Sequence, residues 1–334
     1  MVSAVIFVAT SCVSPLTGFA FWETNLAYEG ESIYNYLQVK NLSDRTILST
    51  NVLFGVQSVT MKDKGLTGMY YDTALAAPAL TDNANSALIL GMGTGTYARQ
   101  LKQYYPKMNI TGVEIDQKIT DLAGEYFDEP ADIPVTTYDG RAWLAASPDK
   151  YDVIMVDAYQ DITIPFQMSS TEFFTMVREH LNPGGVMVVN MNMISDGQGS
   201  INEALSDTIA SVFGNGNTLT ADVPNTTNRE LFAKKPGSGS EENSMQQASK
   251  ALNLRETTYE RTGSEDLEWY MEEVASRFRK VNEPDSASTI LTDDKAPVEV
   301  LGMHAIDQII ADEAGPYRQI LKDEGFGGLL RAVQ

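Results

Sequence analysis

Short, mostly apolar runs alternate with amphipathic segments through the middle of the chain. The runs with the length and composition of strands buried on both faces are Ala87–Leu90, Ile110–Val113, Tyr151–Val156 and Val186–Met191. Segments with the helical spacing of apolar residues separate them, and Thr171–Leu181 is a clear example. Strands that alternate with helices at this spacing predict an α/β fold, in which a mostly parallel, doubly wound sheet is covered on both faces.

The flanking segments extend this pattern. Further helices are predicted at Tyr70–Ala79, Tyr97–Tyr104, Lys118–Phe127, Arg141–Ala146 and Ile201–Phe213. Further strands are predicted at Ile133–Tyr138, Thr218–Val223 and Glu230–Lys234, the last two as a final antiparallel pair. Alternating polar and apolar residues nearer the N-terminus predict strands at Ser32–Val39, Thr46–Thr50 and Val56–Val59. We therefore expect a small β domain before the α/β domain.

Changes in composition divide the chain into four parts. Residues 1–22 form an apolar N-terminal segment, residues 23–80 the small β domain, and residues 81–236 the Rossmann-like nucleotide-binding domain. The segment Pro236–Glu242 is rich in proline, glycine and serine, which predicts a flexible surface segment at the next boundary. Residues 237–334 then form a helical extension, with helices expected at Ser244–Leu252 and Leu267–Arg279 and a helical tail at Ala305–Ala332.

The N-terminal segment allows three interpretations. Residues 2–22 carry no charged side chain and are just long enough to span a bilayer. They could be a membrane anchor or the last helix of a membrane region. No lysine or arginine precedes them as a signal peptide requires, although an uncleaved signal-like segment stays a second hypothesis. The third hypothesis is a buried N-terminal element.

A glycine-rich turn follows the first buried strand. Its sequence is Gly91-Met92-Gly93-Thr94-Gly95-Thr96, a helix comes next, and the following strand ends at Glu114. This order of strand, turn, helix and acid is typical of a nucleotide-binding βαβ unit, in which the acid accepts hydrogen bonds from ribose hydroxyls. Thr96 stands where a dinucleotide-binding turn has its third glycine. The pattern therefore favours an adenosyl-sulfonium ligand over NAD, and a turn that binds nothing is the remaining alternative.

Charge and composition limit the classes of partner. The net charge is −21 at pH 7 and the sequence pI is about 4.4, which disfavours nucleic acid and favours cationic small molecules such as polyamines. A simpler interpretation is that the acidic surface serves solubility alone. Cys12 is the single cysteine, so a disulfide framework and a cysteine-rich metal site are excluded. Neither His180 nor His304 lies in a motif for zinc or for a Ser-His-Asp triad, and we expect no metal.

Two further strand ends carry acids. Asp139-Gly140 follows one predicted strand and Asp157 follows another. The carboxyl ends of parallel strands meet at one edge of the sheet, where ligands bind. Asp139 suits an adenine amino group, and Asp157 reaches the middle of the cleft. The alternatives are turn chemistry for Asp139-Gly140 and a capping role for Asp157, and Asp116 is expected to cap the next helix.

Together these residues resemble the spermidine synthase family of polyamine aminopropyltransferases. The resemblance runs from about residue 28 to residue 300. The residues that carry it are Tyr34–Val39, Arg45, Gln57, Tyr71-Asp72-Thr73 before Pro78, the glycine turn 91–96, Val113–Asp116, Tyr138–Gly140 and Val156–Gln160. The likeness is greatest to spermidine synthase-like domains fused to bacterial membrane regions, which end in a segment like Leu291–Glu299.

The resemblance implies a fold, a reaction and residue roles. It implies a small N-terminal β domain, a methyltransferase-like Rossmann fold, and transfer of an aminopropyl group from decarboxylated S-adenosylmethionine to an amine such as putrescine, without a metal. It also implies a homo-oligomer in the cytoplasm, anchored to the membrane if residues 2–22 span it. The implied site residues are Gln57, Gly91, Gly93 and Gly95 for the donor's sulfonium side chain, Glu114 for ribose, Asp139 and Gly140 for adenine, Tyr71, Asp72 and Tyr159 for the amine, and Asp157 for proton acceptance.

Three departures from the family pattern affect the amine site. Thr94 stands where the family's glycine turn has an aspartate, and Thr73 stands where it has a second acid. After Asp157 the chain continues Ala158-Tyr159-Gln160-Asp161 in place of the usual Ser-Ser-Asp-Pro. The alternatives are therefore a methyltransferase that uses intact S-adenosylmethionine, and a nucleotide-binding module without catalysis.

Overall fold

The computed structural model describes most of the chain between residues 23 and 305. The described residues are 20, 23–51, 55–128, 130, 132–159, 164–192, 197, 199–237, 244–286, 288–305 and 322. Three predicted features lie outside them: the apolar segment 2–22 apart from Ala20, the pair Gln160-Asp161, and nearly all of the helical tail Ala305–Ala332. Within the described residues, no helix is both long enough and apolar enough to cross a membrane.

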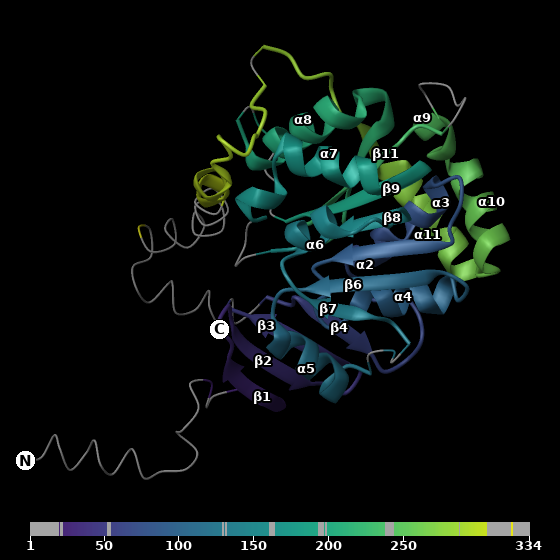
Figure 1. The fold of residues 1–334 in the computed structure, drawn as a ribbon. Coiled ribbons are helices and arrows are strands. Elements are labelled where there is room, and N and C mark those ends of the chain that lie inside the picture. Colours follow the sequence, from purple (N-terminus) through teal and green to yellow (C-terminus); the bar gives the residue numbers. More distant parts are fainter. Residues whose placement is uncertain are drawn as a thin grey trace, which may run out of the picture.

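A mixed sheet forms the centre of the molecule (Figure 1). In the described part of the chain it has eight strands, in the spatial order β12-β10-β11-β9-β8-β5-β6-β7. Their bounds, in chain order, are β5 Ser86–Leu90, β6 Asn109–Glu114, β7 Val135–Thr137, β8 Tyr151–Val156, β9 Leu181–Met191, β10 Thr218–Asp222, β11 Arg229–Lys234 and β12 Phe278–Lys280. The five strands from β7 to β9 are parallel, while β11 is antiparallel to β9 and β10 is antiparallel to β11.

The strands are apolar because helices cover the sheet on both sides. All of β8 is buried, and its side chains alternate between two cores. Val153 and Met155 belong to one core, and Ile154 and Val156 belong to the other. Each such side chain contributes about 1.5–3 kcal/mol when fully buried. The continuous apolar runs in the sequence therefore reflect strands without a solvent-facing side.

Helices on the two faces supply the rest of these cores. The first core includes residues of α2 Tyr70–Ala74, α3 Ala76–Leu80, α4 Thr96–Tyr104, α10 Ala251–Thr262 and α11 Glu265–Arg277. The second includes residues of α6 Gly140–Ala146, α7 Thr171–His180 and α8 Ile201–Phe213. Figure 1 shows α7 and α8 on one side of the sheet and α4, α10 and α11 on the other.

The predicted helix at Tyr70–Ala79 is two short helices. α2 ends after Ala74 and α3 begins at Ala76. Pro78 has no N–H to donate to the carbonyl of Ala74, so the helix is interrupted there. The Ala74 carbonyl instead accepts a hydrogen bond of 3.0 Å from the Tyr97 hydroxyl. This contact joins α2 to α4 across the first core.

A separate antiparallel sheet precedes the α/β unit, as the sequence predicts. Its strands, in order, are β1 Leu26–Glu31, β2 Tyr36–Asn41, β3 Arg45–Thr50 and β4 Ser58–Met61. The predicted strand Ser32–Val39 is wrong in its first half, because the Ser32 hydroxyl accepts hydrogen bonds from the N–H groups of Tyr34 and Asn35 and makes a tight turn. Apolar side chains of β2 and β3 pack against α5, which spans Gln117–Tyr126.

The strand β9 begins earlier than its sequence suggests. Pro183-Gly184-Gly185 is a stop signal for the preceding helix, and the strand is predicted from Val186, yet the strand starts at Leu181. Its pairing with β8 shifts between Leu181 and Val186, which marks a bulge that absorbs these residues. Gly184 has φ +79°, and a Cβ on it would lie 2.1 Å from Oδ2 of Asp82. A side chain there would collide with the loop before β5.

The residues after 236 pack into the same layered unit as the sheet. β12 pairs with β10, and α10 and α11 add Leu254, Leu267 and Met271 to the first core. A further short helix, α9, spans Ser244–Ala248. The C-terminal extension predicted from residue 237 is therefore integrated with the α/β domain. The sequence pattern did not predict α10 because only Leu254 and Thr258 of that helix are buried.

Candidate active site

A cavity of about 280 Å³ opens at the carboxyl ends of β5, β6 and β8. The small sheet closes one side of it. Of the residues predicted for the site, those that line it are Gln57, Tyr71, Gly91, Gly93, Glu114, Asp139, Gly140, Asp157 and Tyr159. Most of the predicted site residues therefore line one continuous cavity, although they come from segments of the chain as far apart as Gln57 and Tyr159.

The glycine turn lies directly on the end of β8. Gly91 has φ +88°, and a Cβ on it would lie 2.4 Å from the carbonyl oxygen of Asp157. Gly93 has φ +55°, and its Cβ would lie 2.7 Å from Oγ of Ser58. Both positions therefore require glycine. Gly95 has φ +83° at the N-terminus of α4 and lies outside the lining of the cavity.

Glu114 is fixed by the backbone. Its Oε2 accepts a hydrogen bond of 2.8 Å from the Gly93 N–H, and its Oε1 accepts one of 3.0 Å from the Asp116 N–H. Burial raises the pKa of this carboxyl, and the two N–H groups oppose that shift. Each carboxylate oxygen still has a lone pair that can face the cavity. The predicted capping role of Asp116 is confirmed, since its Oδ1 accepts from the N–H of Lys118.

Asp139 and Gly140 begin a helix at the edge of the cavity. Oδ1 of Asp139 accepts a hydrogen bond of 2.8 Å from the Ala142 N–H and caps α6. The same side chain lines the cavity, next to Ile115 and Tyr138. A capping role and a ligand-binding role are compatible here, because a carboxylate has two oxygens.

Asp157 lines the cavity directly after the end of β8. Its Oδ2 accepts a hydrogen bond of 2.7 Å from the Tyr70 hydroxyl, and its Oδ1 accepts one of 2.9 Å from the Asn190 side-chain amide. Burial raises the pKa of Asp157 to about 7, the two hydrogen bonds oppose this shift, and the negative charge of Glu114 adds to it. The carboxyl can therefore exchange a proton near neutral pH.

The sequence did not identify Tyr70 or Asn190 as site residues. The rings of Tyr70 and Tyr71 lie with their centroids 4.0 Å apart and their planes tilted by 33°, but only the Tyr70 hydroxyl is hydrogen-bonded to Asp157. Tyr71 lines the cavity and donates its hydroxyl to the backbone oxygen of Gln57 at 2.7 Å. The start of a helix at Tyr70 was predicted, yet which of two adjacent tyrosines faces Asp157 depends on how α2 packs.

Two residues predicted for the amine have other partners. Asp72 lies outside the lining of the cavity, and its buried carboxylate accepts hydrogen bonds from the Thr67 N–H and hydroxyl and the Gly68 N–H. Its role is to hold the loop before α2. Tyr159 does line the cavity, but its hydroxyl donates to the Asn190 carbonyl and accepts from the Asn192 N–H.

Thr94 is buried beneath the glycine turn. Its Oγ1 has no hydrogen-bond partner among the described residues, and the residue is absent from the lining of the cavity. Its N–H donates to Oγ of Ser58 at 3.2 Å. The threonine therefore packs the turn against the small sheet and leaves no charge at this position.

A second buried acid lies one strand beyond Asn190. Glu230 on β11 is directly opposite Asn190 on β9. Its side chain is fully buried, and neither carboxylate oxygen has a hydrogen-bond partner within the described chain. Burial raises the pKa of Glu230 well above its usual range, and the charge of Asp157 adds to this shift. Its position in β11 carries no sequence signal.

The C-terminal segment holds one wall of the cavity in place. Asp293 accepts two hydrogen bonds from the Arg141 guanidinium, at 2.7 and 2.6 Å. Arg141 also donates to the Gln167 carbonyl at 2.7 Å, and Gln167 lines the cavity. A bidentate pair of this kind fixes orientation as well as position. The segment Leu291–Glu299 therefore supports the site from outside it.

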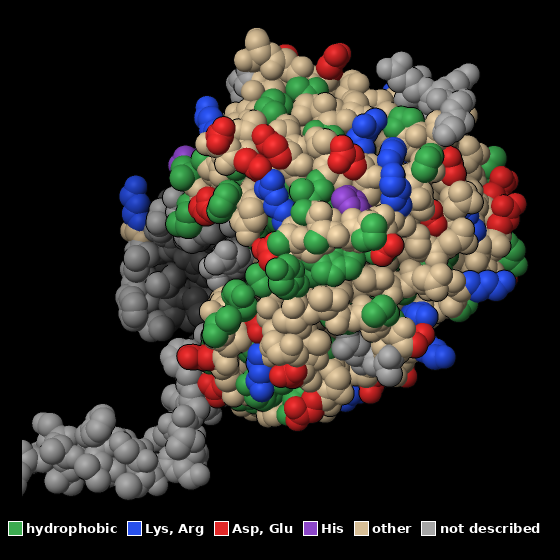
Figure 2. Space-filling view, in the orientation of Figure 1, with side chains coloured by type: hydrophobic (Ala, Val, Ile, Leu, Met, Phe, Trp, Pro, Cys, Tyr) green, Lys and Arg blue, Asp and Glu red, His purple; other side chains and the backbone are tan. Residues whose placement is uncertain are grey.

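Apolar side chains surround the opening of the cavity. Tyr34, Ile115 and Tyr138 line it and are also exposed at the surface. Figure 2 shows a band of hydrophobic side chains across the middle of this face, with acidic and basic side chains interspersed above and below it. Such an opening suits the flat, apolar faces of a nucleobase.

Comparisons with known proteins agree with this geometry. Residues 69–235 match the spermine/spermidine synthase domain family. The chain is 99% identical over 334 residues to a probable polyamine aminopropyl transferase of Bifidobacterium longum (strain NCC 2705), covering all of this chain and 75% of that protein. It is 28% identical over 209 residues to a polyamine aminopropyltransferase of Vibrio vulnificus (strain CMCP6), covering 60% of this chain and 69% of that protein.

A solved structure has the same fold. It is a probable spermidine synthase from Corynebacterium glutamicum ATCC 13032, with a TM-score of 0.55 and 21% identity, covering 80% of this chain and 99% of that chain. The predicted fold class is thus confirmed. From the family match and the near-identical relative, this chain belongs to the spermidine synthase family of polyamine aminopropyltransferases.

Proposed function

We propose that this aminopropyltransferase transfers the aminopropyl group of decarboxylated S-adenosylmethionine to a small cationic amine such as putrescine, with Asp157 as the catalytic residue. The observation that supports this best is the position of Asp157. It lies in the same cavity as the glycine turn and Glu114, and its pKa of about 7 allows it to accept a proton.

The donor's adenosine occupies the end of the cavity formed by β5 and β6. Both oxygens of Glu114 are oriented by backbone N–H groups, so each presents a lone pair to a ribose hydroxyl. The free oxygen of Asp139 accepts from the adenine amino group, and Gly140 lets the base approach the backbone closely. Gln57 and the backbone of Gly91 and Gly93 contact the sulfonium side chain.

The reaction is a direct substitution at carbon. The ammonium of the acceptor first gives one proton to the Asp157 carboxylate, which leaves a neutral amine with a lone pair. That lone pair attacks the donor's methylene carbon next to sulfur, and the C–N bond forms as the C–S bond breaks. The bonding electrons stay on sulfur, which becomes the neutral thioether of methylthioadenosine. Because the sulfonium is a good leaving group, alignment of nitrogen, carbon and sulfur provides much of the acceleration.

The amine is held by few charged groups. Asp157 attracts the ammonium, and the rings of Tyr71 and Tyr159 line its path. Tyr70 and Asn190 are positioning residues that fix the orientation of the Asp157 carboxylate. Thr94 carries no charge, and Asp72 is engaged by its own loop. A site with one anchoring carboxylate favours a short amine that needs no second anion deep in the cavity.

Calorimetric titration with three nucleosides tests the proposal. Decarboxylated S-adenosylmethionine and methylthioadenosine are expected to bind, and intact S-adenosylmethionine is expected to bind at least tenfold more weakly, since its carboxylate would enter a cavity that contains Asp157 and Glu114. Putrescine and longer amines are then assayed for transfer. Preference for intact S-adenosylmethionine, with methyl transfer to an acceptor, would contradict the proposal.

Three expectations from the sequence stay predictions: assembly into a homo-oligomer, location in the cytoplasm, and membrane anchoring through residues 2–22. Sedimentation of the purified protein measures the first. Fractionation of cells that produce the full chain, with and without residues 2–22, measures the other two.

A further inference from the structure

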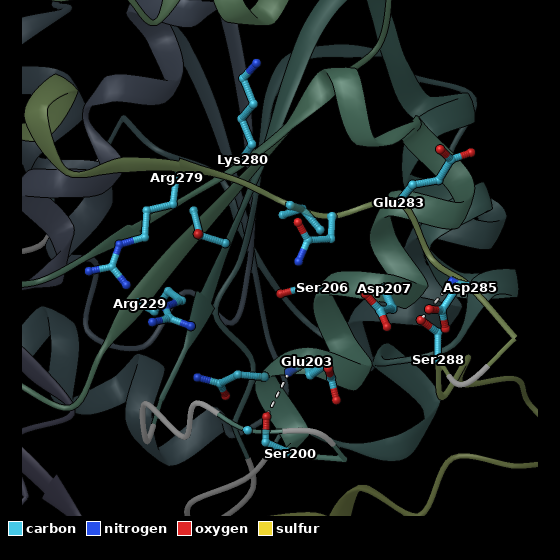
Figure 3. Close-up of a pocket in the computed structure, with 15 residues that line it drawn as sticks. Ser200, Glu203, Ser206, Asp207, Arg229, Arg279, Lys280, Glu283, Asp285 and Ser288 are labelled. Carbon is cyan, nitrogen blue, oxygen red and sulfur yellow. Dashed lines mark hydrogen bonds between the residues drawn. The ribbon is translucent and has the colours of Figure 1, made fainter.

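A second cavity, of about 490 Å³, lies between α8 and the strands β10, β11 and β12, at the far end of the large sheet (Figure 3). Acidic side chains of α8 and basic side chains of β11 and β12 share its lining. Because charges of both signs lie together there, the cavity favours no one class of ligand. The contacts that indicate a further role belong instead to the segment Leu291–Glu299, on the active-site side of the molecule.

This segment is anchored on the second core. Its side chains Leu291 and Val298 are fully buried there. The Leu291 N–H donates to the Thr208 hydroxyl of α8 at 2.9 Å, and the Leu291 carbonyl accepts from the Thr171 N–H of α7 at 2.9 Å. These contacts fix the position of the acidic turn that directly follows Leu291.

Two short stretches of chain form one end of the catalytic cavity. The first wall is Tyr138–Gly140, which follows β7, and the second wall is Pro165–Met168, which precedes α7. Residues of both walls line the cavity. A Cβ on Gly140 would lie 3.6 Å from Cε of Met168, so the two walls are close neighbours. In the proposed function, the adenine of the donor occupies this end.

Asp293 is hydrogen-bonded to a residue next to each wall. Arg141 directly follows the first wall, and its guanidinium donates two hydrogen bonds to the Asp293 carboxylate, at 2.7 and 2.6 Å. Ser170 comes two residues after the second wall, and its hydroxyl donates to Oδ1 of Asp293 at 2.5 Å. One carboxylate from outside the cavity therefore connects both walls.

Arg141 also connects the walls to each other. Its Nη1 donates to the Gln167 carbonyl of the second wall at 2.7 Å. A planar guanidinium has several donors in fixed directions, so it can serve a carboxylate and a carbonyl at once. The bidentate contact with Asp293 fixes the plane of the guanidinium and thereby directs an N–H toward Gln167.

The second wall is a compact turn. Its single 3₁₀ turn, η2, spans Phe166–Met168, and the Ser169 hydroxyl donates to the Phe166 carbonyl at 2.7 Å. The Ser170 hydroxyl accepts from the Phe173 N–H at 3.2 Å and caps α7. Because the turn is closed by its own hydrogen bonds, its position depends on where Ser170 and Gln167 are held.

The Arg141–Asp293 pair differs from an ordinary surface ion pair. The side chains are 22% and 40% exposed, and an isolated pair with such exposure usually adds little to stability. Here the geometry is bidentate, and Ser170 and Gln167 extend the pair into a network. Hydrogen bonds from Arg141, followed by that from Ser170, lower the pKa of Asp293, so its carboxylate is charged at neutral pH. We therefore expect the pair to affect the cavity more than the stability of the fold.

We propose that Arg141 and Asp293 are positioning residues for the donor nucleoside, which hold the two walls at the separation that admits a flat base. The proposal rests on the proposed function, since it takes adenine as the occupant of this end. Both side chains lie outside the lining of the cavity, so they act through the walls and not by contact with the donor. Donor affinity then depends on the docking of the segment Leu291–Glu299.

Calorimetric titration of the full chain with methylthioadenosine, together with steady-state kinetics of aminopropyl transfer, tests this proposal. Asp293→Asn is expected to weaken methylthioadenosine about fivefold or more, because the walls lose a charged tie. The KM for the donor should rise in parallel, while kcat at saturating donor and the KM for the amine stay within about twofold. The matched control Asp294→Asn removes the neighbouring exposed charge and is expected to bind like the wild type.

Two further variants test whether the pair acts as one unit. Arg141→Lys keeps the charge but cannot bond Asp293 in a bidentate manner and Gln167 at once, so it should weaken methylthioadenosine about threefold or more. The double variant Arg141→Gln/Asp293→Asn should bind no more than about twofold more weakly than Arg141→Gln alone, since both changes break the same contact. Unfolding midpoints are measured for every variant, so that affinities are compared only between folded proteins.

Several results would overturn the proposal. They are an unchanged Kd for methylthioadenosine in folded Asp293→Asn and Arg141→Lys, equal losses in Asp293→Asn and Asp294→Asn, additive losses in the double variant, and a decrease in kcat at an unchanged Kd. A wild type that does not bind methylthioadenosine would overturn the proposed function itself. A wild type that binds it as tightly as Asp293→Asn does would overturn the positioning role alone.

Discussion

The two ends of the active-site cavity hold their carboxylates in different ways. At the end proposed to bind the nucleotide, which we call the nucleotide end, backbone N–H groups fix Glu114 and Asp139, because both residues stand at the junction of a strand and a turn or helix. At the end proposed to bind the amine, which we call the amine end, side chains from two distant segments, Tyr70 and Asn190, hold Asp157. The nucleotide end is thus fixed by local structure, and the amine end by packing.

This difference suits the two ends of the cavity to different tasks, ligand recognition at the first and proton transfer at the second. A carboxylate held by the backbone keeps one position whether or not a ligand is bound, which suits recognition of ribose and adenine. In the proposed reaction Asp157 accepts a proton, and its surroundings raise its pKa to about 7. Glu230, fully buried opposite Asn190 on the neighbouring strand, has no hydrogen-bond partner in the described chain. We expect mutations at the two ends to affect different constants.

Asp157→Asn is expected to have the largest effect. The amide keeps the size of the side chain but cannot accept a proton, so kcat should fall by about 10²–10⁴-fold. Affinity for decarboxylated S-adenosylmethionine, measured by calorimetry, should stay within severalfold because the donor is held at the other end. Near-normal turnover in this variant would remove Asp157 from the catalytic role.

Glu114→Gln should show the opposite pattern. The side chain loses its charge and presents one N–H₂ group where ribose hydroxyls need an acceptor, so donor affinity should fall by about 1–3 kcal/mol. The KM for the amine should change little, as the amine site does not use Glu114. Methylthioadenosine lacks the aminopropyl group, so calorimetry with it measures the affinity for the nucleoside alone. An unchanged Kd would show that the ribose binds elsewhere.

Tyr70→Phe should have an intermediate effect confined to the amine end. It removes one hydrogen bond to the Asp157 carboxylate, worth about 1–2 kcal/mol in such a setting. We expect a several-fold decrease in kcat and an upward shift of the acidic limb of the pH profile, since the bond stabilises the ionised form. Tyr71→Phe, which removes a hydroxyl that donates to the Gln57 carbonyl and not to Asp157, is the matched control and should leave the acidic limb in place.

Glu230→Met should have the smallest effect on activity and should change stability with pH. Burial raises the pKa of Glu230 in the folded state, so above pH about 4.3 the folded protein holds a proton that the unfolded chain has lost. The free energy of unfolding of the wild type therefore decreases as pH rises. The variant lacks the contribution of Glu230 to this decrease. We expect a gain of about 1–3 kcal/mol that is larger at pH 8 than at pH 5. A gain that does not vary with pH would contradict the titration of Glu230.

The sequence placed four residues of the proposed nucleotide end in the cavity for a physical reason. A close approach of backbone to ligand requires glycine, and a strand end followed by an acid places that acid at the edge of the sheet. Gly91, Gly93, Glu114 and Asp139 follow these local rules and line the cavity. Asp157 was found by the same rule, which predicts where a strand-end acid lies but not what surrounds it.

The remaining features depend on contacts between distant segments. Asn190 lies within an apolar strand and Tyr70 beside a second tyrosine, so neither stands out along the chain. Asp72 was assigned to the amine site from the family resemblance, yet its carboxylate accepts a hydrogen bond from the Thr67 hydroxyl in the preceding loop. β12 and α10 were also missed, because a strand of three residues and a weakly amphipathic helix gain their stability from packing against β10 and α3.

The most direct test of the central claim is the pH dependence of kcat/KM for aminopropyl transfer, measured for the wild type and for Asp157→Asn. If Asp157 accepts the proton, wild-type kcat/KM should fall about tenfold per pH unit below a midpoint near pH 7, because the protonated acid cannot act as a base. The variant should show low activity without this limb. A wild-type profile that is flat from about pH 5 to pH 8, or an identical limb in Asp157→Asn, would contradict the assignment of Asp157.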